Sequence, residues 1–483
     1  MPINSEWRPD KSSDVPLYMQ IVDRFRDLVI TGEWSPGYRI PSQRDLAVHF
    51  KVNRSTISTA IDELISHGIL KTEVGRGTFV EDELWNSLVE PPKGWNIYRD
   101  NGLFIENTES IQMVNELLGN NDYINLGSND LPKESTHISY IKKSLMDLSD
   151  ELENLNYLPP LGHYGLREQI AKQLIQKGIY TSPENIFVTS GSVQALHLIS
   201  LAMVKKEMTL FTEDPSYINT LNIFQSMGID IKKIGMDRQG ISMTRLSKAI
   251  KKTDFSLLYT IPNYHNPTNI LMSKKRRDDL LQWCEHNKIA IIEDDAYGDL
   301  WFDEMPPHAL KSSDNNGLVL YLGTVSQTLS AGLRLGWIVG PKPVIKRLSD
   351  VKMQTDYGTS SLSQLIVKRL FESGAYDVHL NSLRRRLKEK RNIMLDLLKT
   401  HFKNLGTWSV PKGGYNIWLN LNTKVPAAKL FNTAFERKII LDPNMSYEDK
   451  DLNGIRLSYS SIHESSMEPA LKILKDIIIK IQK

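Results

Sequence analysis

Residues suited to chemistry follow directly after several short apolar segments of this chain. Ser190-Gly191-Ser192 comes after the apolar segment 186–189. A glycine with small hydroxyl residues at a strand-to-helix junction presents free backbone N–H groups to a phosphate, although most such junctions only cap a helix. Later apolar segments are followed in turn by Glu213-Asp214-Pro215-Ser216-Tyr217, Pro262-Asn263-Tyr264-His265-Asn266-Pro267-Thr268, Glu293-Asp294-Asp295-Ala296-Tyr297 and Gly323-Thr324-Val325-Ser326-Gln327. Each group alone has a structural explanation, such as a turn carboxylate or a packed aromatic ring, but their joint occurrence favours a cofactor-shaped pocket.

The segments that precede these groups are typical of buried strands. They are residues 186–189, 208–211, 255–259, 289–292, 318–321 and 335–339. Because helix-length stretches separate most of them, they predict a mainly parallel sheet covered on both faces, with ligands beyond the carboxyl ends of the strands. The stretch from about Asp350 to the end is more helical, with strands expected at 418–421 and 455–459, and predicts a smaller α+β lobe.

In this order the motifs resemble those of fold-type I pyridoxal-phosphate enzymes, the class I aminotransferases. The resemblance implies that Tyr217 stacks on the pyridine ring and that Asp294 keeps the ring nitrogen protonated, which makes the ring an electron sink. It also implies hydrogen bonds from Asn266 and Tyr297 to the phenolic oxygen. The phosphate-binding residues that it implies are Gly191, Ser192, Val193, Thr324, Ser326 and Arg334.

Two further residues take roles from the same resemblance. Arg456, in Ile455-Arg456-Leu457-Ser458-Tyr459, matches the residue that clamps an amino-acid carboxylate bidentately, although an arginine there can also serve an ordinary ion pair. Tyr157, in the segment 157–162, matches the position that reaches a phosphate across a dimer interface. The resemblance therefore implies an amino-acid-like effector and a homodimer.

One position departs from the family pattern. The motif Ser-Lys-Thr-Leu-x-x-Gly-Leu-Arg reads here as residues 326–334 with Gln327 at the expected Schiff-base lysine, and no lysine lies between Lys311 and Lys342. A carboxamide nitrogen cannot form the covalent link, and it cannot act as the proton-transfer base that transamination needs. A lysine distant in sequence could still substitute. Gln327 has two explanations: an engineered Lys→Gln change, or the natural loss of the covalent step in a protein that only senses a ligand.

The N-terminal residues 15–80 predict a different unit. Leu17, Ile21, Phe25 and Leu28 recur on one helical face, and Ser42 with Asp45 is a capping signal for a second helix. A third helix is expected from Arg54, followed by strands at 69–73 and 78–80 around the turn 74–77. Two helices around a tight turn followed by a hairpin form a winged helix, which suits the major groove.

This region resembles the DNA-binding domain of GntR-family bacterial regulators, through Pro16-Leu17-Tyr18, the segments 41–47 and 52–56, and Gly75-Arg76-Gly77-Thr78-Phe79-Val80. Together with the aminotransferase motifs, the chain resembles the MocR/GabR subgroup of that family. The DNA-contacting residues that we predict from the motif are Ser42, Arg44, Asn53, Arg54, Ser55, Thr56, Gly75 and Arg76.

Composition bounds the remaining possibilities. Apolar residues make up 40% and charged residues 24%, as in globular proteins, and a net charge of +2 means that any DNA contact must be local. The single cysteine, Cys284, excludes a disulfide framework and a cysteine-based zinc site, and we predict no metal. The start of the chain lacks the apolar stretch of a signal peptide, and no segment suits a membrane helix. We therefore expect a cytoplasmic protein without membrane contact.

The sequence thus predicts a multidomain chain: a winged helix at 15–80, mainly α with a β-hairpin, a linker at 81–120, a large α/β fold-type I domain at 121–350 and a small C-terminal α+β lobe at 351–483. The function expected is a DNA-binding transcriptional regulator that senses pyridoxal phosphate, or its amino-acid adduct, without a covalent bond. One alternative is an active aminotransferase with an accessory DNA-binding domain, against which Gln327 argues. Another is a relic that binds DNA and no cofactor, against which the retained Asp294, Asn266, Tyr297 and Arg334 argue.

Overall fold

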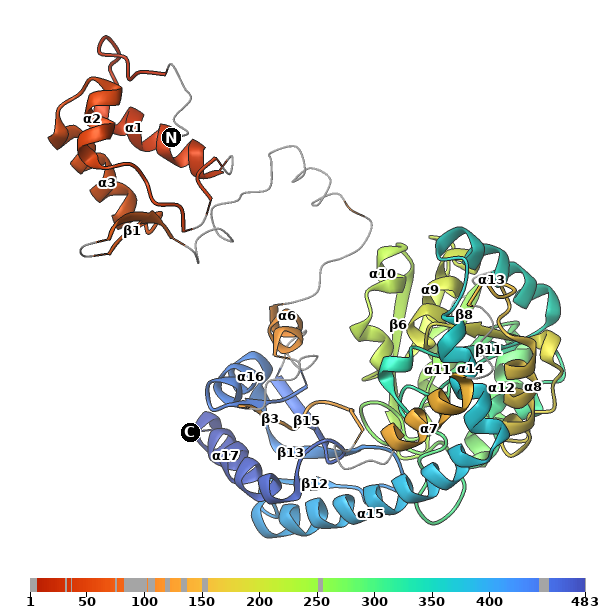
Figure 1. The fold of residues 1–483 in the computed structure, drawn as a ribbon. Helices are drawn as coiled ribbons and strands as arrows, with labels where there is room; N and C mark the ends of the chain where they lie inside the picture. Colours follow the sequence, from red (N-terminus) through yellow and green to blue (C-terminus); the bar gives the residue numbers. More distant parts are fainter. Residues whose placement is uncertain are drawn as a thin grey trace. The chain divides into compact units, whose positions relative to one another are not determined.

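The computed structural model describes residues 7–30, 33–35, 37–73, 76–81, 102, 109–117, 122–131, 137–149, 155–250, 255–442 and 451–482. The chain divides into two compact units, Met1–Gly102 and Leu103–Lys483. Figure 1 follows the chain from the helices of the first unit to the layered sheet of the second. Within the described residues, no helix has both the length and the apolar character needed to cross a membrane.

The first unit is a winged helix. Its elements are α1 (Leu17–Ile30), α2 (Gln43–Phe50), α3 (Arg54–Ser66), β1 (Leu70–Glu73) and β2 (Gly77–Val80), the two strands pairing antiparallel. The Ser42 hydroxyl accepts the backbone N–H of Asp45 and so caps α2, as the sequence predicts. A core that includes Phe25, Trp34 and Phe50 joins the three helices. The apolar pattern of α1 predicts a helix end near Gly32, a residue outside the described part.

An eight-stranded sheet forms the centre of the second unit, in the order β4-β11-β10-β9-β8-β5-β6-β7. The neighbours from β10 to β6 pair in parallel, whereas β11 and β7 run antiparallel to their neighbours. The expected mainly parallel sheet is confirmed, with β6 and β7 as strands that the sequence analysis did not anticipate. The strands are β4 (Ile186–Thr189), β5 (Thr209–Asp214), β6 (Asp230–Asp237), β7 (Gly240–Ile241), β8 (Ser256–Thr260), β9 (Ala290–Asp294), β10 (Val319–Thr324) and β11 (Gly336–Val339).

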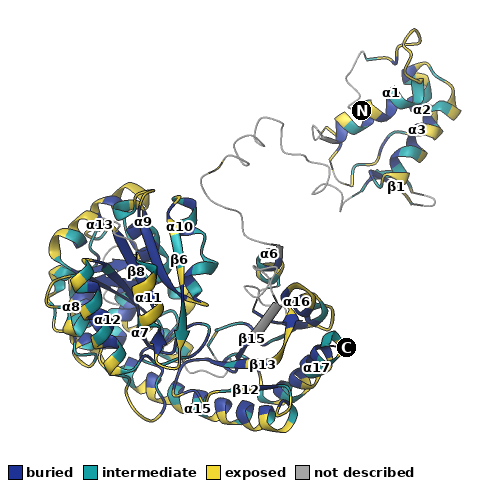
Figure 2. Cartoon of the chain, turned by 180° about the vertical axis from the view of Figure 1, so that it is seen from behind, coloured by how far each residue is buried: buried dark blue, intermediate teal, exposed yellow. Residues whose placement is uncertain are grey.

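Helices cover both faces of this sheet, and the central strands are buried (Figure 2). Successive strand residues enter different cores, because neighbouring side chains of a strand point to opposite faces. Leu257 and Tyr259 of β8 pack in the core that holds residues of α9 and α13, whereas Leu258 packs with residues of α11 and α12. The helices around the sheet are α7 (His137–Ser149), α8 (Tyr164–Ile175), α9 (Ser192–Met203), α10 (Ile223–Ser226), α11 (Met243–Ala249), α12 (Lys274–Asn287), α13 (Lys342–Thr355) and α14 (Ser361–Glu372).

A smaller α+β lobe completes the second unit. A three-stranded sheet in the order β12-β13-β15 packs with helices that include the long α15, and β14 pairs with β3 from the beginning of this unit. Both strands expected here from sequence are present: 418–421 lies within β13, and 455–459 falls in β15 except for Tyr459, which follows the strand. The elements are α6 (Glu109–Glu116), β3 (Ile124–Asn125), α15 (Ala375–His401), β12 (Gly406–Trp408), β13 (Asn416–Pro426), α16 (Ala427–Glu436), β14 (Ile439–Ile440), β15 (Asp451–Ser458) and α17 (Glu464–Gln482).

Candidate functional site

A cavity of ≈ 260 Å³ lies where the carboxyl ends of the central strands meet the small lobe. β9 and β10 contribute Asp294 and Thr324, and β15 contributes Arg456. The turn after β3 also reaches the cavity, because β3 pairs with β14 of the small lobe. The other described lining residues are Val114, Asn125, Gly127, Ser128, Asn129, Ser192, Tyr217, Ile261, Asn266, Ala296, Tyr297, Ser326, Gln327, Ile440, Leu441 and Asp442.

Asp294 is a buried carboxylate in the cavity wall, 3% exposed. Its Oδ2 accepts the Tyr259 hydroxyl at 2.7 Å, and its Oδ1 accepts the backbone N–H of Ala296 at 3.2 Å. Burial raises the pKa of Asp294 to about 6, and the Tyr259 hydrogen bond works against that rise. A positive partner in the cavity, such as a protonated ring nitrogen, would stabilise the ionised Asp294 carboxylate, which burial destabilises.

The loop between β4 and α9 meets Arg334. Gly191 precedes α9 with a φ of 91°, and Arg334 Nη2 donates to the Ser190 carbonyl at 3.2 Å. A Cβ on Gly191 would lie 3.1 Å from Arg334 Nη2, so the glycine leaves room for the guanidinium. Nearby, Thr324 and Ser326 share a hydroxyl hydrogen bond of 3.0 Å. A helix N-terminus, an arginine and hydroxyl groups suit a phosphate.

Gln327 lies in the cavity wall, immediately after Ser326. Its backbone carbonyl accepts the hydroxyl of Tyr415, a buried residue next to β13. The side chain at this position therefore projects from a loop that the small lobe holds in place. It brings a carboxamide to the cavity where the resemblance expects an amine.

Tyr217, Asn266 and Tyr297 all line the cavity, as expected. The backbone N–H of Tyr217 donates to the Asn266 carbonyl at 3.1 Å, which fixes the two segments together. The Tyr297 hydroxyl accepts from Asn129 Nδ2 at 3.0 Å. Burial raises the pKa of both tyrosines, so their hydroxyl groups stay protonated at neutral pH and can donate hydrogen bonds.

All three guanidinium nitrogens of Arg456 contact other residues of the chain. Nη1 donates to Asn266 Oδ1 at 2.7 Å, and Nη2 donates to the Gly127 carbonyl at 2.5 Å. Nε lies 3.1 Å from Asp442 Oδ2, an ion pair rather than an aligned hydrogen bond. The side chains of Arg456 and Asp442 are 9% and 7% exposed. The predicted carboxylate clamp therefore already has an internal carboxylate beside it.

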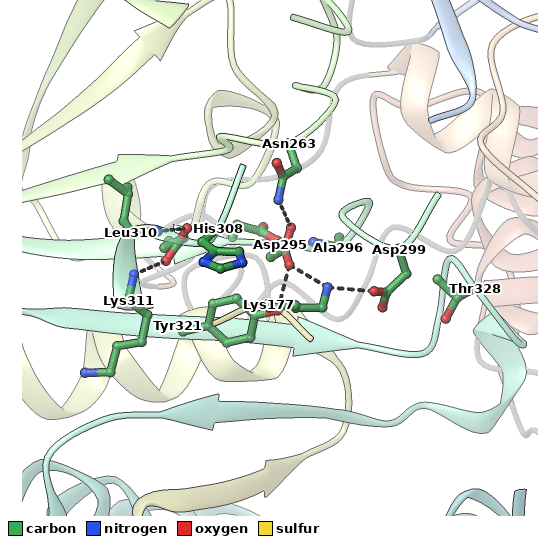
Figure 3. Close-up of polar contacts among 12 residues, drawn as sticks. Lys177, Asn263, Asp295, Ala296, Asp299, His308, Leu310, Lys311, Tyr321 and Thr328 are labelled. Carbon is green, nitrogen blue, oxygen red and sulfur yellow. Dashed lines mark hydrogen bonds and ion pairs between the residues drawn. The ribbon is translucent and has the colours of Figure 1, made fainter. Parts of the chain in front are cut away.

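The residue after Asp294 faces a separate polar network (Figure 3). Asp295 accepts from Lys177 Nζ at 2.8 Å, Asn263 Nδ2 at 2.7 Å and the Tyr321 hydroxyl at 2.6 Å. Burial alone would raise the pKa of Asp295, but the Lys177 charge and these hydrogen bonds outweigh it and lower the pKa. Lys177 also pairs with Asp299 at 2.8 Å. Of these two adjacent carboxylates, Asp294 therefore lies in the cavity wall, and Asp295 forms a structural ion pair with Lys177.

Most predicted residues of the large domain gather at the cavity. Those in its wall are Ser192, Tyr217, Asn266, Asp294, Tyr297, Thr324, Ser326 and Arg456. Gly191 and Arg334 contact each other at its margin, and Val193 packs against a core cluster instead. Tyr157 is 87% exposed, with its ring 5.7 Å from that of Tyr357, and is not among the lining residues. Its predicted role across a dimer interface stays a prediction.

Sequence reasoning missed Asn125, Ser128, Asn129 and Asp442, which line the same cavity. Asn125 belongs to β3, Ser128 and Asn129 follow it, and Asp442 follows β14; these two-residue strands have no strong apolar pattern, so no local signal marked the four residues. Within the described part of the chain, no group of three or more His, Cys, Asp or Glu side chains is arranged to hold a metal ion.

The first unit presents an exposed polar face at the start of α3. Arg54 and Ser55 are exposed, Thr56 is half-buried, and Ile57 is buried in the core. Asn53 is the N-cap residue of α3, and Arg44 is exposed on the preceding α2. Two exposed arginines on adjacent helices, held by one core, suit contacts to base edges or phosphates.

The remaining predicted DNA contacts differ in how they are held. Ser42 is engaged at the start of α2, where its hydroxyl contacts Asp45 Oδ2 at 2.8 Å. Arg76, at the hairpin turn, pairs with Glu73 at 3.1 Å and keeps 78% of its side chain exposed. Gly75 lies outside the described residues. Arg76 is therefore accessible at the tip of the wing.

Comparison with known families matches both units. Residues 17–80 match "Bacterial regulatory proteins, gntR family", and residues 121–474 match "Aminotransferase class I and II". The HTH-type transcriptional regulator YisV of Bacillus subtilis is 41% identical over 469 residues, covering 97% of either chain. The HTH-type transcriptional regulator NorG of Staphylococcus aureus is 30% identical over 92% of this chain and 100% of its own.

Solved structures resemble the second unit. Pyrococcus horikoshii kynurenine aminotransferase, solved in complex with PMP, superposes with a TM-score of 0.75 and 26% identity, over 81% of this chain and 100% of that chain. An archaeal alanine:glyoxylate aminotransferase superposes with a TM-score of 0.73 and 27% identity, over 80% of this chain and 99% of that chain. The second unit therefore has the fold of these aminotransferases.

Proposed function

Because the chain belongs to the gntR family of bacterial transcriptional regulators and carries a class I and II aminotransferase domain, we propose that its cavity senses a pyridoxal-type ligand. The ligand is pyridoxal phosphate, or an adduct of it with an amino compound. It is held without a covalent bond to the protein, and its occupancy changes binding of the first unit to operator DNA. Such a regulator acts in the cytoplasm, where the DNA is.

The observation that carries this proposal is the buried carboxylate of Asp294. A carboxylate that is 3% exposed, with its pKa raised to about 6, is costly for the fold unless a positive partner reaches it. The pyridinium nitrogen of a pyridoxal compound is such a partner. At the far side of the ring, the Gly191 loop with Arg334 would receive the phosphate.

Other residues would orient the ring. Asn266 and Tyr297 lie in the cavity wall with polar groups that suit the phenolic oxygen, and Tyr217 supplies an aromatic face. When bound, pyridoxal phosphate supplies an aldehyde and an electron-withdrawing ring. In this chain Gln327 stands where the covalent attachment and proton transfer would need an amine, so binding without turnover is the function that the residues favour.

A homodimer is the assembly that we propose for this sensor. Leu155, Tyr157 and Tyr357 are exposed hydrophobic side chains of the second unit, at 55%, 87% and 62% exposure. Exposed aromatic groups of this kind are typical of interfaces. A dimer would also present two winged helices to a two-fold symmetric operator.

The test is equilibrium binding of pyridoxal phosphate to the purified full chain, followed by borohydride reduction. The unmodified chain is expected to bind the cofactor reversibly and to release it after reduction and denaturation. Gln327→Lys is expected to retain it covalently, because the new amine projects from the same loop beside Ser326. Gln327→Met, of similar length without an amine, is the matched control and should stay reversible.

Three outcomes contradict the proposal. Cofactor retained on the unmodified chain after reduction would mean that another lysine forms the link. If neither the unmodified chain nor Gln327→Lys binds pyridoxal phosphate, the cavity does not serve this cofactor. Turnover of an amino donor by the unmodified chain would instead favour the alternative of a working aminotransferase.

A further inference from the structure

Asp442 gives the cavity a charge that the motifs do not contain. Its Oδ2 lies 3.1 Å from Nε of Arg456, both side chains are nearly buried, and both residues line the cavity. Asp442 follows β14 and Arg456 belongs to β15, so the pair is held between two strands of the small lobe. The pair belongs to the cavity wall and not to the solvent-exposed surface.

This pairing changes what Arg456 can recognise. An isolated arginine in a pocket attracts a carboxylate through its charge and its fork of N–H donors. Here Asp442 supplies one negative charge at Nε, while Asn266 and Gly127 accept from the other two nitrogens. A ligand carboxylate would have to displace Asp442 or lie close to it, and two carboxylates together in a buried site repel each other.

The other charges around the cavity add to this effect. Asp294 is a second carboxylate in the wall, and Gln327 contributes no positive charge. Arg334 lies at the margin with the Ser190 carbonyl, on the side that suits a phosphate. Near Arg456 the charge of the described wall is therefore balanced by Asp442, and the wall favours a neutral polar group over an anionic one.

We propose that Asp442 makes the cavity select an amino compound whose group near Arg456 is a carboxamide, in place of a free carboxylate. This inference rests on the proposed function, because it concerns the ligand of the same cavity. A carboxamide offers a carbonyl to the Arg456 donors and an N–H to the Asp442 carboxylate, so it complements both members of the pair. An α-carboxylate complements only one of them.

The experiment compares two stable, nearly isosteric ligands on the full chain by calorimetry. They are N-(5′-phosphopyridoxyl)-L-alanine and the corresponding alaninamide, which differ only in carboxylate against carboxamide. The unmodified chain is expected to bind the amide about 10- to 100-fold more tightly. Asp442→Asn removes the negative charge and is expected to abolish or reverse that preference.

The matched control is Asp237→Asn. Asp237 also forms an aspartate–arginine pair, with Arg276 at 2.9 Å, but neither residue lines the cavity. This variant is expected to keep the preference of the unmodified chain. The comparison of the two ligands on the unmodified chain tests the inference even if Asp442→Asn does not fold.

Pyridoxal phosphate serves as the reference ligand, because it has no group that corresponds to the α-carboxylate. If it binds and the alanine adduct binds as tightly as the amide or more tightly, the inference about Asp442 is overturned and the proposed function stands. If none of the three ligands binds, the proposed function itself is overturned. An unchanged preference in Asp442→Asn would also contradict the role of Asp442.

Discussion

Replacing Asp294 by Asn should stabilise the ligand-free protein while weakening its affinity for pyridoxal phosphate. Asp294 is buried and ionised at neutral pH, and among the described residues it accepts hydrogen bonds from the Tyr259 hydroxyl and the Ala296 N–H. Asn keeps the side-chain shape and a carbonyl acceptor for Tyr259, loses the weaker 3.2 Å acceptor for the Ala296 N–H, and removes the charge. The same change removes the negative partner of the ring nitrogen, so affinity for the cofactor should fall about 10- to 100-fold.

The size of the stability effect follows from the pKa. Burial raises the pKa of Asp294 from 3.8 to about 6. Each pKa unit corresponds to roughly 1.4 kcal/mol, so ionisation of Asp294 costs the folded state about 3 kcal/mol at neutral pH. Because the folded pKa is the higher one, this carboxyl group does not oppose folding below about pH 4, and its cost grows as the pH rises towards about 7. Asn carries no such cost.

The assay unfolds the ligand-free full chain with denaturant at several pH values between pH 4 and pH 8. The fluorescence of the second unit is the signal that monitors unfolding. The difference in unfolding free energy between Asp294→Asn and the unmodified chain should increase by about 3 kcal/mol between about pH 4 and about pH 7 and then stay constant. Other buried groups, such as Glu293, whose pKa burial raises to about 7, act in both proteins and cancel in the difference.

Asp295→Asn is the neighbouring control with the opposite sign. The Lys177 ion pair and hydrogen bonds lower the pKa of Asp295, so its ionised form stabilises the fold, and this stability is lost as the pH falls through that lowered pKa. Asp295→Asn should therefore destabilise the protein at neutral pH. A stability difference for Asp294→Asn that stays flat from pH 4 to pH 7, or destabilisation by both variants alike, would refute the reasoning.

Two further predictions concern the surfaces. Arg54→Ala should weaken binding to the preferred operator by about 1–3 kcal/mol in fluorescence anisotropy titrations, because Arg54 is exposed at the start of α3. If Arg54→Ala, Arg44→Ala and Arg76→Ala all leave operator affinity unchanged, this face does not contact the DNA. Sedimentation should show a dimer at micromolar concentration, with Tyr157→Ala shifting it towards the 55.2 kDa monomer. A single 55.2 kDa species with and without cofactor and DNA would contradict the dimer.

Local sequence patterns were sufficient for the winged helix and for much of the sheet. Periodic apolar residues, the Ser42 cap and glycine turns are short-range signals, and the structure has α1, α2, α3 and the hairpin where these signals predict them. Strand β6 was missed because four of its eight residues, Asp230, Lys232, Lys233 and Asp237, are charged and it is partly exposed, as suits a strand near the sheet edge. Its pairing with β5 and β7, not its composition, makes it a strand.

In the candidate site, too, some features follow from the sequence and others only from the tertiary structure. The sequence by itself determined which polar residues follow the strands, and parallel strands must bring those residues to one edge. Successive residues of an extended chain point to opposite faces, but only the tertiary structure decided that Asp294, at the end of β9, faces the cavity while Asp295 meets Lys177. It also decided the pairing of Asp442 with Arg456. Ion pairs between separate strands leave no periodic signal in either segment, since the contact exists only after β14 and β15 pack in the small lobe.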